Sequence, residues 1–172
     1  LKPELIKDLV QKVGGTIVEC NTAYAGRRNT TEAHLEAARE HGFFDIANVD
    51  IMDAEGEIKI PVKDTTHIKY NIVGKNLANY DFMINLAHFK GHAMGGFGGV
   101  LKNQSIGNAS SRGKAYIHSA GRNEEVAKIW KFTDDQIGFL ESMAAAAQSI
   151  HDYFGGGERI IYINVMNNMS ID

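Results

Sequence analysis

The chain has 172 residues, a charged fraction of 23% and a formal net charge of -3. This length supports one domain with a sizeable core and leaves little room for two. The weakly acidic balance offers no basic surface for nucleic acid, and no apolar run approaches the roughly 20 residues that span a bilayer, so we expect a cytoplasmic protein with neither partner.

Cys20 is the single cysteine of the chain, which excludes an intramolecular disulfide. One thiol also supplies too few ligands for a structural zinc or iron–sulfur site, which takes about four. We expect Cys20 to be a small core residue rather than a nucleophile, because no histidine lies close by in sequence to activate it. The chain begins with Leu1 and stops at Asp172, just past an apolar strand, so we interpret it as a fragment of a longer protein.

The first part of the chain shows helix and strand patterns in turn. Residues 3–13 carry apolar side chains on one helical face, and a short β-rich run follows at 16–20. A pattern resembling a capping box opens a second helix over 29–41. Two alternating runs, 46–52 and 57–62, flank the turn sequence DAEG and predict a hairpin at the edge of the sheet.

The second part adds the elements expected at the centre of the fold. Residues 81–87 (DFMINLA) are nearly all apolar, which is typical of a strand covered on both faces. A long helix is predicted over 133–154, starting at Thr133 and Gln136, and a further strand over 159–166. The alternation predicts one α/β domain with a mostly parallel central sheet and helices on both faces.

The most informative stretch runs from His88 to Gly107, directly after the 81–87 strand. Ligands of open α/β sheets bind beyond the carboxyl ends of the strands, so this position alone indicates a site. The glycines Gly95, Gly96, Gly98 and Gly99 leave backbone amides free to face a phosphate or carboxylate. Candidate side chains that would bind the anion or transfer a proton are Lys90, His92, Lys102 and Asn103.

A plainer interpretation of the same stretch stays open. The glycines would then serve a tight turn, and the histidines would cap backbone carbonyls. The stretch matches neither a Walker A loop nor a dinucleotide-binding fingerprint, so it does not indicate nucleotide binding.

Three further residues are candidates because they follow predicted strands. Arg27 and Arg28 come after the first strand, where they would hold a carboxylate or, alternatively, form a solvated surface pair. His118 ends the run Ala-Tyr-Ile, which we interpret as a strand end at the same site. The remaining helical histidines are expected at the surface: His34, His41 and His151.

The residues Lys90-Gly-His92, the following Gly-rich turn, Lys102-Asn103 and Gly107 resemble the domain of unknown function 362 family, often called uncharacterised iron–sulfur centre proteins. The layout from Thr16 to Met166 is also similar. Members commonly carry a ferredoxin-like segment C-terminal to this domain. The resemblance therefore implies [4Fe–4S] clusters in the full-length protein but not in this fragment, and a redox-linked role with a redox partner and a small anionic ligand or cofactor at the Gly-rich loop.

The spacing of His92, Lys102 and His118 also resembles that of nickel-pincer lactate racemases, which act on a small 2-hydroxy acid. This resemblance implies that Lys102 anchors a nickel-pincer nucleotide, that His118 ligates the nickel and that His92 moves a proton at the substrate carbon, with both histidines close to the metal. His88 is a candidate second base. The alternatives are therefore a ligand-binding domain of an iron–sulfur protein, a racemase-like enzyme, and a non-catalytic structural or interaction domain.

Overall fold

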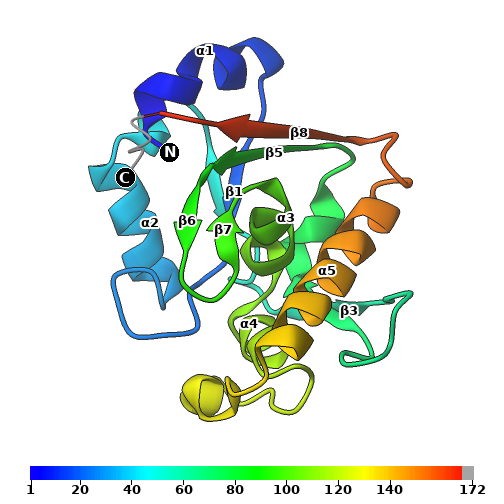
Figure 1. Ribbon diagram of the computed structural model, residues 1–172. Coiled ribbons are helices and arrows are strands. Elements are labelled where there is room, and N and C mark those ends of the chain that lie inside the picture. Colours follow the sequence, from blue (N-terminus) through cyan, green and yellow to red (C-terminus); the bar gives the residue numbers. More distant parts are fainter. Residues whose placement is uncertain (168–172) are drawn as a thin grey trace.

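The computed structural model describes residues 1–167 and is shown in Figure 1. The α-helices are α1 (Pro3–Val13), α2 (Thr31–Glu40), α3 (Val100–Lys102), α4 (Ser111–His118) and α5 (Gln136–Tyr153). Short 3-10 helices span Phe43–Asp45, Lys75–Asn79 and Val126–Phe132, and a π-helical turn spans Asn103–Gly107. The expected chain boundary at Asp172 lies outside the described residues.

The strands form four separate two-stranded sheets. They are β1 (Ile17–Glu19), β2 (Val49–Ile51), β3 (Glu57–Ile60), β4 (Asn71–Gly74), β5 (Met83–His88), β6 (Lys90–His92), β7 (Gly96–Gly98) and β8 (Ile160–Val165). The pairs β1–β2 and β5–β8 are parallel, whereas β3–β4 and β6–β7 are antiparallel. The mixture of helices and strands is confirmed, but the expected single parallel sheet is not found within residues 1–167.

The predicted edge hairpin is wrong. β2 pairs in parallel with β1, and β3 pairs with β4, an element that the sequence pattern did not reveal. The chain changes partner at Met52, whose amide donates to Glu19 and whose carbonyl accepts from the Asn76 amide. Alternation of apolar and polar residues predicts which face of a strand is buried, but it does not predict which strand lies beside it.

The α5 helix begins later than expected and packs only part of the expected apolar stripe. Its N-cap is Asp135, which accepts a hydrogen bond from the Gly138 amide at 2.8 Å, so the helix begins later than Thr133. Helical spacing predicts a packed stripe of Ile137, Leu140, Ala144, Ala147 and Phe154. Of these, Ala147 and Phe154 are buried, whereas Ile137 is 71% exposed. The helix also packs on the core through Phe139 and Met143, where burial of each large apolar side chain contributes about 2 kcal/mol.

The Gly-rich segment folds as the β6–β7 hairpin rather than as a strand-to-helix loop. Gly96 has φ +75, a left-handed conformation that a side chain would disfavour, and it closes the turn. Gly99 is extended, and a Cβ there would lie 2.9 Å from Oδ1 of Asn164. That oxygen accepts from the Val100 amide at 3.1 Å, so the glycine lets β8 hold the start of α3.

His118 ends a helix, and its assignment to a strand end is therefore wrong. The α4 helix starts at the N-cap Ser110, whose hydroxyl accepts from the Gly113 amide at 3.1 Å. A Cβ on Gly113 would lie 2.0 Å from the carbonyl oxygen of Ile72, so α4 packs directly on the backbone of β4. The short apolar run fits a buried helix as well as a strand, and only the cap distinguishes them.

In Figure 1, α1 lies beside β8 at one end of the molecule, while α5 runs along another side and α4 lies near the opposite end. The two parallel pairs share a core in which Cys20 and Met83 pack with Ile150 and Phe154. Within residues 1–167, no helix combines the length and the apolar character needed to cross a membrane.

Candidate functional site

A cavity of about 360 Å³ brings together side chains from the Gly-rich segment and from α4. His92, Lys102, Asn103 and His118 all line it, although they lie on four different elements. We call it the cationic cavity. These four side chains therefore lie around one cavity, while their chemical roles stay predictions.

Lys102 is positioned by a polar network beneath it. Asn85 on β5 donates to the carbonyl of Val100 at 2.8 Å and accepts from the Asn103 amide at 2.8 Å. Gln104 continues the network by donating to the Ala147 carbonyl on α5 at 2.6 Å. These bonds hold α3 and the π-helical turn in place, and such turns frequently occur at functional sites.

The amine of Lys102 lies in an electropositive setting. Burial lowers its pKa, and the positive charges of Lys90 and Lys114 lower it further. A lysine whose charge is not compensated by a carboxylate is stabilised when an anion binds beside it. The surroundings of this amine therefore carry a positive electrostatic potential.

His92 has one ring nitrogen committed to the hairpin. Its Nδ1 accepts a hydrogen bond from the Gly95 amide at 3.0 Å, which assigns the proton of the neutral ring to Nε2. Burial lowers the pKa of His92, and Lys102 and Lys90 lower it further. The ring is thus neutral near pH 7 and presents an N–H donor at Nε2.

His118 has the opposite tautomer. Its Nδ1 donates to the Lys114 carbonyl at 2.7 Å, so Nε2 carries a free lone pair, and within the described chain that atom has no hydrogen-bond partner. The ring stacks on Phe139 with the centroids 4.9 Å apart. Burial lowers the pKa of His118 to about 4, and Lys102 lowers it too, although the bond to the Lys114 carbonyl opposes this.

Three further charged residues line the cationic cavity. Lys114 and Glu19 were not predicted as site residues, whereas Arg28 was a candidate together with Arg27. Lys114 on α4 is buried, and its Nζ donates to the Ala109 carbonyl at 2.6 Å. Burial lowers the pKa of Lys114 despite the nearby Cys20, Asp53 and Glu19. Arg28 and Glu19 also line the cavity. Lys114 was not predicted because the residues that follow it were interpreted as a strand, whereas they continue the α4 helix that carries Lys114.

Glu19 is the one acidic residue on the wall of the cationic cavity. It ends β1, as expected for a group at the carboxyl end of a parallel strand. Glu19 is exposed as a residue, but the protein atoms packed around its carboxyl raise the pKa of that group, while Lys114 and Arg28 counteract this rise.

Two aromatic side chains lie at the edge of the same cavity. Tyr24 and Trp130 are 50% and 55% exposed, and their ring centroids are 5.9 Å apart. Trp130 also meets the His118 ring edge-on, with the centroids 6.0 Å apart. Exposed aromatic rings at the edge of a cavity, here close to the cations that line it, can pack against a ligand that enters.

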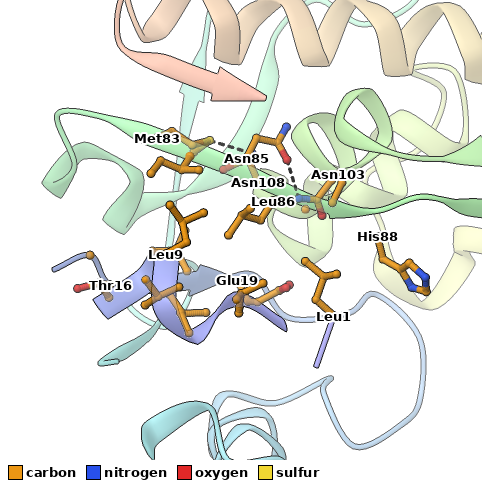
Figure 2. Close-up of a pocket in the computed structure, with 18 of the residues that line it drawn as sticks. Leu1, Leu9, Thr16, Glu19, Met83, Asn85, Leu86, His88, Asn103 and Asn108 are labelled. Atoms are coloured by element: carbon orange, nitrogen blue, oxygen red, sulfur yellow. Dashed lines mark hydrogen bonds between the residues drawn. The ribbon is translucent and has the colours of Figure 1, made fainter. Parts of the chain in front are cut away.

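A second cavity of about 640 Å³ adjoins the first and is drawn in Figure 2. It lies along β1, β5 and α1, and we call it the slot. Lys102, Asn103, Arg28 and Glu19 line both cavities, so the two are joined at these side chains. His88, the possible second base, lines the slot and not the cationic cavity.

The other predicted residues separate into three groups. Lys90, Gly98 and Gly99 line the slot. Gly95 and Gly96 form the hairpin turn and line neither cavity, because the turn carries them away from the strand end. Arg27 lines neither cavity, since it is exposed and forms a salt bridge with Glu40, whereas its neighbour Arg28 lines both.

His34 does not lie at the surface, contrary to expectation. It is 4% exposed, and its Nδ1 lies 3.3 Å from Oδ1 of Asn21. Burial lowers the pKa of His34 to about 4, and Arg28 and Lys114 lower it further. His41 is exposed, whereas His151 is partly buried with Nδ1 2.8 Å from the Tyr162 hydroxyl. The buried position of His34 follows from the contact of α2 with Asn21, which helical periodicity does not reveal.

The residues do not fit a [4Fe–4S] cluster. Cys20 is buried as expected, its Sγ donates to the Asn108 carbonyl at 3.4 Å, and burial raises its pKa to about 12. A cluster needs about four thiolates. Across residues 1–167, no three His, Cys, Asp or Glu side chains gather to hold a metal ion. A bare metal ion therefore has too few protein ligands here.

Fold and site together define an α/β domain with a cavity lined by cationic side chains beside a Gly-rich hairpin. The family model described as "Domain of unknown function (DUF362)" matches residues 1–172, the whole chain. The chain belongs to the DUF362 family. Comparisons with curated proteins and with solved structures give no match.

Proposed function

We propose that this DUF362 domain binds a small anion in the cationic cavity. The observation that carries the proposal is the charge on its wall: Lys102, Lys114 and Arg28 face one acidic side chain, Glu19. The cavity lies at the carboxyl end of β1, where Glu19 and Cys20 line it, and this is the usual ligand position in α/β folds. The Nε2–H of His92 adds a neutral donor.

Titration calorimetry with sulfate and with inorganic phosphate tests the proposal. Lys102→Ala should weaken binding by at least about tenfold, since a hydrogen bond to a charged group contributes about 1.5–3 kcal/mol. Lys75→Ala is the matched control, because Lys75 is exposed and lines neither cavity. Equal affinity in wild-type protein and Lys102→Ala, or an equal loss in both variants, would contradict the proposal.

A second candidate function is favoured by the tautomer of His118. Metal-bound histidines usually donate their other N–H to a carbonyl or carboxylate, and His118 donates Nδ1–H to Lys114. Because protein ligands are too few for a bare ion, only a metal complex that brings its own donors fits. A nickel-pincer nucleotide is such a complex, and it would supply redox chemistry at the substrate carbon. Lys102 would anchor it, Nε2 of His118 would ligate nickel and His92 would move a proton at the substrate carbon.

Intact mass and metal content of the protein purified from its native host test this second candidate. A covalent adduct that disappears in Lys102→Ala, with nickel that disappears in His118→Ala, would support it. A mass equal to that of the unmodified chain, without nickel, would count against it. The redox role implied by the iron–sulfur resemblance is a separate proposal, and iron and sulfide analysis of the full-length protein tests it.

A further inference from the structure

The slot follows the edges of two strands rather than the face of a sheet. Residues 16–19 at β1 and all six residues of β5, 83–88, line it. Successive side chains of a strand point to opposite faces, so a cavity that touches every residue must lie along the strand edge. β1 pairs with β2 and β5 pairs with β8, and neither strand has a second partner within residues 1–167.

Both free edges offer backbone hydrogen-bonding groups to the slot. Buried N–H and C=O groups without partners are costly, so the slot favours an occupant that can pair with them. Its remaining wall is apolar and comes largely from α1, through Leu9, Val10 and Val13. An occupant should therefore combine amide groups along its length with apolar side groups.

The two edges run in the same direction toward the basic residues. In Figure 2, Thr16 and Met83 lie toward one end of the slot, whereas Glu19 and His88 lie further toward the other end, near Asn103. Lys102 and Arg28, shared with the cationic cavity, line the slot as well. A strand parallel to β1 and β5 would point its carboxyl terminus at these cations.

We propose that the anion bound by this domain is the carboxylate of a short peptide-like acid, whose amide backbone lies in the slot parallel to β1 and β5. This inference rests on the proposed anion site and names its ligand class: a free oligopeptide or an N-acyl amino acid. The volume of about 640 Å³ falls within the range of small-molecule pockets, roughly 300–1,000 Å³. When a peptide adds as a strand to a free sheet edge, backbone hydrogen bonds contribute most of the affinity and the side groups determine the selectivity.

Calorimetry with four matched compounds tests the inference: N-acetyl-valyl-leucyl-valine, its C-terminal amide, its analogue N-methylated at the central amide, and acetate. The free acid should bind at least about tenfold more tightly than acetate and than its C-terminal amide. N-methylation should weaken binding about fivefold, because it removes one backbone donor. In Lys102→Ala, the acid and its amide should bind equally.

Hydrogen exchange locates the bound compound. The acid should protect amides within residues 83–88, and Leu9→Asp should abolish this protection, whereas Leu5→Asp, on an exposed position of the same helix, should not. If sulfate binds but the tripeptide acid binds no better than acetate, the inference fails and the anion site stands. If neither binds, both fail. A twelve-residue peptide with the same C-terminus that binds over about tenfold more tightly would overturn the small ligand in favour of a protein terminus.

Discussion

Two regions of the molecule bury a histidine whose pKa is lowered to about 4, yet they differ in what surrounds the ring. The paired network consists of Asn21, Thr31, His34, Asp53 and Ser111, linked by hydrogen bonds of 2.9–3.3 Å. His118 instead lines a cavity with Lys102 and Lys114. Burial and a shifted pKa are thus shared by both regions, and only the cationic cavity has room and unpaired donors for a ligand.

The largest expected effect is on the stability of the paired network. Asp53 accepts the Asn21 amide at 2.9 Å and the Ser111 amide at 3.2 Å, and so joins β1 to the start of α4. Asp53→Ala should lower the free energy of unfolding by about 3 kcal/mol, because it removes two bonds to a charged acceptor. Urea denaturation measures this loss. Sulfate affinity should not fall, because Asp53 does not line the cationic cavity and its negative charge near Lys114 is removed, and a loss of about tenfold would show that the two regions are not separate.

A smaller effect is expected from the carboxylate of the cationic cavity. Glu19→Gln removes the acidic charge from its wall and should raise sulfate affinity about fivefold near pH 7, equal to about 1 kcal/mol of repulsion. Stability should change little, since no hydrogen bond of the Glu19 side chain is found among the described residues. Calorimetry at two salt concentrations measures the gain, which should shrink at high salt. Unchanged or weaker binding would place the anion elsewhere.

The smallest effect is the pH dependence of stability. His34 and His118 have a pKa of about 4 in the folded protein, against an ordinary value of 6.5. The unfolded chain therefore binds protons that the folded protein does not, and the free energy of unfolding should fall as the pH falls from 6.5 toward 4. Saturating sulfate should offset the shares of His118 and His92, which line the cationic cavity, by favouring their protonated forms.

Urea denaturation with and without sulfate, in wild-type protein and in His34→Gln, separates the contribution of His34 to this pH dependence from the contribution of the histidines in the cationic cavity. His34→Gln should reduce the pH slope in both conditions, because His34 lies outside the cationic cavity and burial is the main cause of its lowered pKa. If sulfate removed the slope in wild-type protein entirely, His34 would belong to the ligand site, contrary to the comparison above.

The sequence predicted several of the residues that line the cationic cavity but little of the strand pairing. The buried strand ending at His88 and the cations that follow it predict a site, because strand ends in α/β folds collect ligands, and His92, Lys102 and Asn103 from this stretch line the cavity. Partners of strands were not predictable, since β2 and β3 alternate in the same way but belong to different sheets. Lys114 was missed because Ala115–His118 fits a strand or a helix, and the choice depends on a cap at Ser110.

A proton NMR titration of the histidine rings with sulfate is the sharpest test of anion binding in the cationic cavity. The signals of His92 and His118 should shift together and saturate at one affinity, while those of His34, His41 and His151 should stay in place. Lys102→Ala should weaken both shifts in parallel. Saturable binding that leaves His92 and His118 unmoved, or that moves all histidines alike, would contradict a shared anion site in the cationic cavity.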